Sequence, residues 1–191
     1  MAREAQMDGG SRMNPWRIIG WGMAAGLLLL PLVAMQFTDG VDWTALDFVF
    51  AAIMFGGTGL VFELAVRMAP NAAYRSGVAC ALAAAFLLVW INGAVGIIGD
   101  EDNPLNLLYG GVIAVALIGA VAARFRAKGM TRAMTAAAGA QALMIVVAVI
   151  AGTDDPPGWA GLVLLNGFFV GLFALAAALF RNAAREPQPG A

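Results

Sequence analysis

The apolar residues of this chain fall into six long blocks separated by short polar segments, and not into short alternating runs. Each block can cross a membrane as a helix, because a hydrocarbon core of about 30 Å needs roughly 20 apolar residues. The pattern predicts an all-α integral membrane bundle of six transmembrane helices, at 16–37, 43–66, 76–99, 105–124, 131–152 and 159–180. A short segment, 1–15, precedes this transmembrane domain, 16–180, and a tail, 181–191, follows it.

The segments between the blocks carry residues that start helices. Asp42 is placed to cap the helix that begins at Trp43, and Asn103-Pro104 puts a proline in the first turn of the fourth helix. The pair Pro156-Pro157 precedes the sixth block. These signals favour true turns between separate helices.

The charges separate by sign along the chain, and this separation predicts an orientation. The eleven basic residues lie before or at the start of the first block, in or beside the second and fourth connections, or after the sixth block: Arg3, Arg12, Arg17, Arg67, Arg75, Arg124, Arg126, Lys128, Arg132, Arg181 and Arg185. The other three connections hold only acidic charges: Asp39, Asp42, Asp100, Glu101, Asp102, Asp154 and Asp155. By the positive-inside rule, both termini are expected in the cytoplasm.

Composition narrows the chemistry that the chain could perform. Its 191 residues are 61% apolar and 12% charged. Six spans of roughly 20 residues fit into this length only if the loops are very short, so we expect no soluble domain. Histidine is absent and Cys80 is the single cysteine, which removes the usual ligands of haem and zinc. No block contains a nucleophile beside a base, and the one lysine, Lys128, lies in a connection. We therefore expect no enzyme activity, no cofactor, no metal site and no nucleic-acid partner.

Four polar residues lie in the outer half of the predicted membrane region, by counting from the helix ends: Asp47, Asn92, Tyr109 and Asn166. With Trp90 nearby, they could line a polar pocket that opens to the outside, because polar groups in hydrocarbon are costly and often functional. The alternative is structural. Asp47 would then favour the positive end of its helix dipole, and the asparagines would form hydrogen bonds between helices.

Further polar residues have simpler interpretations. Glu63 and Arg67, one turn apart near the inner end of the second helix, predict an ion pair, with a proton-relay role for Glu63 as the alternative. Gln141 and Thr135 are expected to make packing contacts. The acidic segment 99–104 could bind a divalent cation weakly, but it lacks the spacing of a calcium loop, which favours solvated helix caps.

Small residues recur four apart on several helices, as in Gly167 and Gly171, and would let helices pack closely. The sequence Trp90-Ile91-Asn92-Gly93, together with the acidic segment 99–104, resembles parts of small multi-pass inner-membrane proteins of bacteria that have no assigned activity. The stretch 87–112 carries this likeness, which covers about the middle half of the chain. It implies a bacterial plasma membrane location and no particular function.

Two classes of function remain open. The first is a non-catalytic accessory or scaffold subunit whose helices pack in a larger membrane complex. The second is a transporter or channel for a small solute or ion, which would pass through the polar pocket. Such a protein could act as a homo-oligomer. The low intramembrane polarity favours the first.

Overall fold

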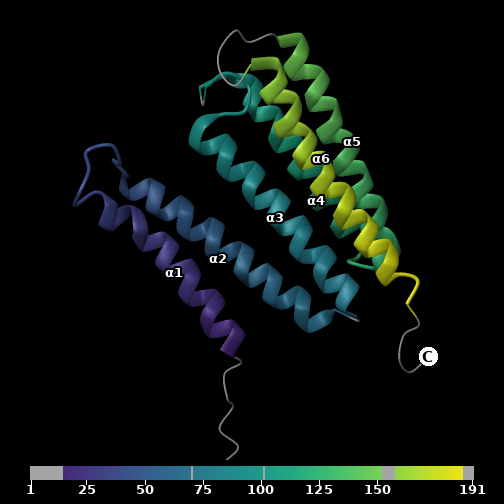
Figure 1. Cartoon of the computed structure of the whole chain (residues 1–191). Coiled ribbons are helices and arrows are strands. Elements are labelled where there is room, and N and C mark those ends of the chain that lie inside the picture. Colours follow the sequence, from purple (N-terminus) through teal and green to yellow (C-terminus); the bar gives the residue numbers. More distant parts are fainter. Residues whose placement is uncertain (1–14, 70, 101, 152–157, 187–191) are drawn as a thin grey trace, which may run out of the picture. The chain divides into compact units, whose positions relative to one another are not determined.

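The computed structural model describes residues 15–69, 71–100, 102–151 and 158–186, and this part of the chain is helical with no strand (Figure 1). Its elements are α1 (Pro15–Ala34), α2 (Ala45–Met68), α3 (Ala72–Val95), the 3₁₀ turn η1 (Pro104–Leu107), α4 (Leu108–Ala122), α5 (Ala127–Ala151) and α6 (Gly158–Ala183). Six helices, with η1 and α4 counted together, are long and apolar enough to cross a membrane. The chain therefore has the features of a multi-pass membrane protein, as its apolar blocks predict.

Several predicted features lie outside the described residues. They are almost all of segment 1–15, the end of the tail, Glu101, Asp154, Asp155 and the Pro156-Pro157 pair. The remaining residues form two compact parts, one ending at Val61 and the other beginning at Phe62.

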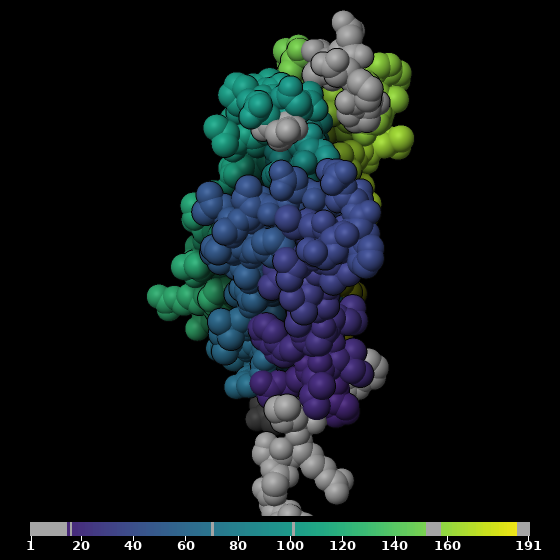
Figure 2. Space-filling view, turned by 90° about the vertical axis from the view of Figure 1, so that its left-hand side faces the viewer, coloured from purple at the N-terminus to yellow at the C-terminus, as the bar shows by residue number. Residues whose placement is uncertain are grey.

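In the first part, α1 and the portion of α2 that ends at Val61 contact each other through an aromatic ring. A Cβ atom built on Gly59 would lie 3.2 Å from the Trp21 indole, so the ring packs directly over this glycine. Most other side chains of the two helices are exposed, as the purple and blue surface in Figure 2 illustrates. Large exposed apolar side chains are normal for helices whose surroundings are lipid or another membrane protein.

The second part is a four-helix bundle of α3 to α6, and its buried core comes from residues 74–183. On α5 and α6, buried positions recur in alternating steps of three and four residues, the spacing that lets two helices interlock along a seam. On α6 this seam consists of Leu162, Asn166, Phe169, Phe173, Ala176, Phe180 and Ala183. On α5 it consists of Met130, Met134, Ala137, Gln141, Met144 and Ala148.

Small residues bring the helices of the bundle close together. The α5 helix packs against both α4 and α6, and α6 also packs against α3. A Cβ atom on Gly119 of α4 would lie 2.8 Å from the Cβ of Ala133 on α5, which is closer than real side chains approach. Between α3 and α6, Cys80 Sγ donates to the carbonyl oxygen of Leu172 over 3.2 Å. The helices are thus held at distances that only small side chains permit.

The connection between α3 and α4 folds back into the bundle. The α3 helix ends at Val95, four residues earlier than predicted, because Gly96 adopts a positive φ of 70° and turns the chain. Ile97 and Ile98 are then fully buried. Their two N–H groups donate to Asn106 Oδ1 over 3.1 and 2.9 Å, and Asn106 Nδ2 donates to the carbonyl oxygens of Ile98 and Asp100.

The opposite end of the bundle, which we call the basic end, consists of the start of α3, the α4–α5 turn and the end of α6. Asn71 caps α3 by accepting from Tyr74 N–H, so the helix begins at Ala72, four residues earlier than predicted. Asn71 Nδ2 donates to the carbonyl oxygen of Ala183, and the Tyr74 hydroxyl donates to that of Phe125. These two bonds tie the three segments together.

The α4–α5 turn is short because two residues in it take left-handed conformations. Arg124 and Phe125 have φ values of 48° and 55°, which reverse the chain within a few residues. The α4 helix consequently ends at Ala122 and α5 begins at Ala127, where the apolar pattern predicts 124 and 131. Helix ends of this kind depend on backbone geometry that hydropathy does not report.

The close approach of α4 and α5 leads to a first prediction. Replacing Gly119→Ala should destabilise the bundle, because the added methyl group would collide with Ala133, and overpacking typically costs about 1–3 kcal/mol. The control is Gly139→Ala on α5, where an added Cβ meets nothing within 4 Å. Thermal unfolding in detergent should show a lower midpoint for the first variant only. Equal midpoints would contradict the close helix contact.

A second prediction concerns the folded connection. Asn106→Ala should lower the unfolding midpoint, because it leaves the buried N–H groups of Ile97 and Ile98 without acceptors, at about 1–3 kcal/mol for each unsatisfied group. Leu107→Ala is the control, since the neighbouring Leu107 side chain is 80% exposed. Hydrogen exchange at the two isoleucine amides should become faster only in the Asn106 variant. Unchanged exchange would show that another group holds this connection.

Candidate functional site: a buried polar cluster

Three polar side chains from three different helices meet in the interior of the bundle. Asn166 Oδ1 accepts hydrogen bonds from the Tyr109 hydroxyl and from Gln141 Nε2, each over 2.9 Å. Asn166 Nδ2 donates to the carbonyl oxygen of Leu162, one turn earlier on α6, over 2.8 Å. Gln141 and Asn166 are completely buried and Tyr109 is 2% exposed, so the cluster is closed to its surroundings.

The heptad-like seams place these residues together. Gln141 and Asn166 both occupy seam positions, Gln141 on α5 and Asn166 on α6, and Tyr109 is the first buried residue of α4. A polar residue at a seam position specifies the register of a helix pair, because sliding by one turn would bury its polar group without a partner. The cluster therefore determines how far α4, α5 and α6 can slide along one another.

Two buried amide atoms have no hydrogen-bond partner in the described part of the chain: Gln141 Oε1 and Asn92 Nδ2. Amide groups can make several hydrogen bonds each. Gln141 makes its bond to Asn166 through Nε2 and leaves its carbonyl oxygen open. The cluster is centred on Asn166, and Gln141 is its least satisfied member.

Of the five residues in the predicted pocket, Tyr109 and Asn166 are joined by a direct hydrogen bond. Asn92 is partly exposed near the end of α3, and its carbonyl oxygen accepts from the Gly96 N–H that ends the helix. Trp90, also partly buried on α3, stacks on Phe86 with ring centroids 5.6 Å apart.

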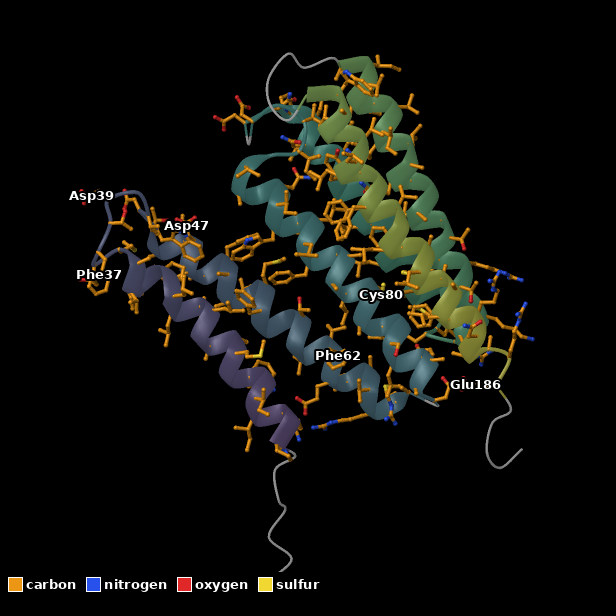
Figure 3. All side chains as sticks on the ribbon, in the orientation of Figure 1. Phe37, Asp39, Asp47, Phe62, Cys80 and Glu186 are labelled. Carbon is orange, nitrogen blue, oxygen red and sulfur yellow. The ribbon has the colours of Figure 1, made fainter. Side chains whose placement is uncertain are left out.

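Asp47 is exposed at the start of α2, in the first compact part, at the position labelled in Figure 3. Its Oδ2 atom accepts from the Thr44 N–H over 2.7 Å and from the Thr44 hydroxyl over 2.8 Å. These bonds satisfy a free N–H group at the helix start, which is the role of a capping residue. The geometry agrees with the structural alternative for this carboxylate.

Glu63 and Arg67 form the predicted ion pair, with Arg67 Nη2 2.6 Å from Glu63 Oε1. The Arg67 side chain is 61% exposed and that of Glu63 is 16% exposed. This arrangement fits an arginine that extends from the end of a helix towards the membrane surface.

The acidic segment is used for capping where it is described. Asn103 Oδ1 accepts from the Leu105 N–H, and the Asp100 carbonyl oxygen accepts from Asn106. Among the described residues, no group of three His, Cys, Asp or Glu side chains is placed to hold a metal ion.

Sequence reasoning missed the roles of Gln141 and Asn106. A signal existed for Gln141, because it and Asn166 are polar residues within long apolar helices and should face the interior for that reason. Asn106 had no comparable signal, since it follows an asparagine-proline turn where polar residues are ordinary.

Comparison with known proteins found no matching protein family, no matching curated protein and no matching solved structure. The function must therefore be inferred from the helices and side chains themselves.

A third prediction tests the central place of Asn166 in the cluster. Asn166→Leu should destabilise the bundle more than Gln141→Met, because it leaves the Tyr109 hydroxyl and the Gln141 amide without their shared acceptor. The expected loss for Asn166→Leu is about 1–3 kcal/mol, the usual cost of a buried group left unsatisfied. Gln141→Met should cost less, because it also removes a carbonyl oxygen that has no partner.

Unfolding midpoints in detergent, measured for the two single variants and the double variant, would show how strongly Asn166 and Gln141 depend on each other for stability. In the double variant, the loss should be smaller than the sum of the single losses. Equal losses for the single variants, with additive behaviour, would show that the cluster is not organised by Asn166.

Proposed function

We propose that this chain is a non-catalytic accessory or scaffold subunit of a larger complex in the bacterial inner membrane, with both termini in the cytoplasm. The observation that carries the proposal is the closed Tyr109–Gln141–Asn166 cluster. The hydroxyl and amide groups of this cluster bond to one another across three helices and so set the helix register. They are buried and have no contact with the surroundings. A solute pathway would instead need such groups in contact with water or substrate.

The outer faces of the bundle support the same proposal. Gly110 and Gly111 on α4, and Gly167 and Gly171 on α6, have no neighbouring atom within 4 Å of an added Cβ. Exposed small residues allow another helix to approach a backbone closely. Large apolar side chains such as Leu164 and Phe168 are exposed beside the α6 glycines. Such faces suit contact with other membrane helices as well as with lipid.

The orientation rests on the distribution of charge, now seen on a folded bundle. Apart from Arg67 at the end of α2, the described basic residues of the second part lie at or just after the segments of the basic end, whereas Asp100 and Asp102 lie in the connection at the other end of α3. The positive-inside rule then places the basic end in the cytoplasm.

The alternative function is a small solute or ion transporter or channel. The observation in its favour is that Asn92 Nδ2 and Gln141 Oε1 are buried without partners, as groups that contact a transported solute could be. In a transporter, Asn92→Leu should abolish solute flux while the protein remains folded.

A fourth prediction separates these functions. Purified gently from its native membrane at its native level, the tagged protein should bring a second protein with it at a fixed stoichiometry, detected by mass spectrometry. Asn92→Leu should leave this ratio unchanged, because Asn92 Nδ2 has no hydrogen-bond partner among the described residues and so does not hold the helices together. Asn166→Leu, which disturbs the fold, serves as the control that should reduce recovery.

Recovery of the chain alone or only as a homo-oligomer would contradict the accessory role. Flux that disappears in the Asn92 variant would then establish the transporter alternative.

A further inference from the structure

Six exposed cations surround the basic end of the bundle: Arg75, Arg124, Arg126, Lys128, Arg132 and Arg181. They come from α3, from the α4–α5 turn, from α5 and from the end of α6. The hydrogen bonds of Asn71 to Ala183 and of Tyr74 to Phe125 hold these segments side by side. In Figure 3 blue nitrogen atoms gather around this end, on the same side as Glu186. Orientation alone requires basic residues on this side, but it does not require them to be held together on one folded surface.

The cations at this end have little opposing charge. Within the described residues from 62 to 186, none of the six forms an ion pair, whereas Arg67 is paired with Glu63. Glu186 is the one described carboxylate at the end of α6, and it follows another arginine, Arg185. The surface therefore has a net positive charge that a phosphate-bearing partner could neutralise.

An aromatic residue stands among these charges because of the unusual α4–α5 turn. Phe125 is 56% exposed, and both it and Arg124 have left-handed backbone conformations that side chains other than glycine seldom adopt. Two hydrogen bonds to the backbone of Phe125 maintain the turn: its N–H donates to the carbonyl oxygen of Ala120, and its carbonyl oxygen accepts from the Tyr74 hydroxyl. The fold thus presents an exposed aromatic residue that is flanked in sequence by two exposed arginines, Arg124 and Arg126.

We propose that the basic end binds the headgroup of an anionic phospholipid that carries two phosphates, with Arg124 and Arg126 on the phosphates and Phe125 in the interfacial layer. Arginine pairs with phosphate through two parallel N–H···O bonds, and clusters of basic residues at helix ends bind lipid headgroups. An aromatic ring favours the boundary between headgroups and hydrocarbon, which a free phosphate in water does not provide. The proposal rests on the membrane-spanning helices, and the proposed orientation decides only which leaflet supplies the lipid. It does not depend on the accessory role.

The fifth prediction uses the full chain in detergent and native mass spectrometry with three added lipids: a diphosphate anionic phospholipid, a monophosphate one at twice the concentration, and a zwitterionic one. The diphosphate lipid should bind most tightly although the first two supply equal charge. Arg126→Gln should weaken its binding about fivefold, as expected for one basic residue near a membrane surface. Arg126→Lys should weaken binding by less than Arg126→Gln does, because lysine keeps the charge but cannot form two parallel hydrogen bonds to one phosphate.

Asn103→Asp is the matched control, since it changes the net charge by the same amount at the opposite end of the bundle. Aspartate can keep the cap that Asn103 makes to the Leu105 N–H. This variant should bind the lipid as the original protein does. Equal weakening in Asn103→Asp and Arg126→Gln would overturn the proposal, as would equal affinity for the two anionic lipids.

A second variant separates the lipid from free phosphate. Phe125→Ser should weaken binding of the diphosphate lipid, because the ring's contribution in the interfacial layer is lost. If inorganic pyrophosphate displaces the lipid and the serine substitution changes nothing, the surface recognises phosphate from solution and the lipid proposal fails. Because Arg126 and Phe125 are exposed, their side chains are not part of the core, and thermal unfolding would check that each variant is folded.

Discussion

Asn166 Oδ1 is the atom on which the arrangement of three helices depends. In hydrocarbon no water can replace a lost hydrogen bond, so a buried amide must find its partners within the protein. This oxygen accepts from the Tyr109 hydroxyl on α4 and from Gln141 on α5 at equal distances. Apolar seams with a regular spacing can pair in several registers that differ by whole turns, but these two bonds form in only one register. The apolar seams supply contact area, and the polar cluster selects their alignment.

The number and type of helices could be predicted from sequence because the membrane imposes a length on each apolar block. Their ends were less predictable. Gly96 and Asn106 end α3 through bonds made across the α3–α4 connection, and the left-handed pair Arg124 and Phe125 shortens the next turn. Such ends depend on local backbone geometry and on partners many residues away. Hydropathy reports neither.

The sequence also did not reveal which face of each helix is buried, because in a membrane protein the lipid-facing side is as apolar as the core. On α6, Phe168 is half exposed while its neighbour Phe169 is fully buried. Residue depth counted from helix ends did identify Tyr109 and Asn166, which are bonded to each other. Counting depth did not reveal the bonds between Asp47 and Thr44, although the Thr44-x-x-Asp47 spacing is that of a helix cap and was visible in the sequence.

The order in which the chain is made gives the cluster a further significance. Gln141 lies 25 residues before Asn166, so α4 and α5 leave the ribosome before the helix that satisfies them. The short α4–α5 turn and the Gly119–Ala133 contact allow these two helices to pair as an early hairpin. This hairpin enters the membrane with the Tyr109 and Gln141 side chains still lacking their common acceptor. The α6 helix, which is made after α4 and α5, therefore supplies the acceptor that completes the cluster, and a chain interrupted before α6 would present two polar groups by which quality-control proteases could distinguish it from a chain that contains α6.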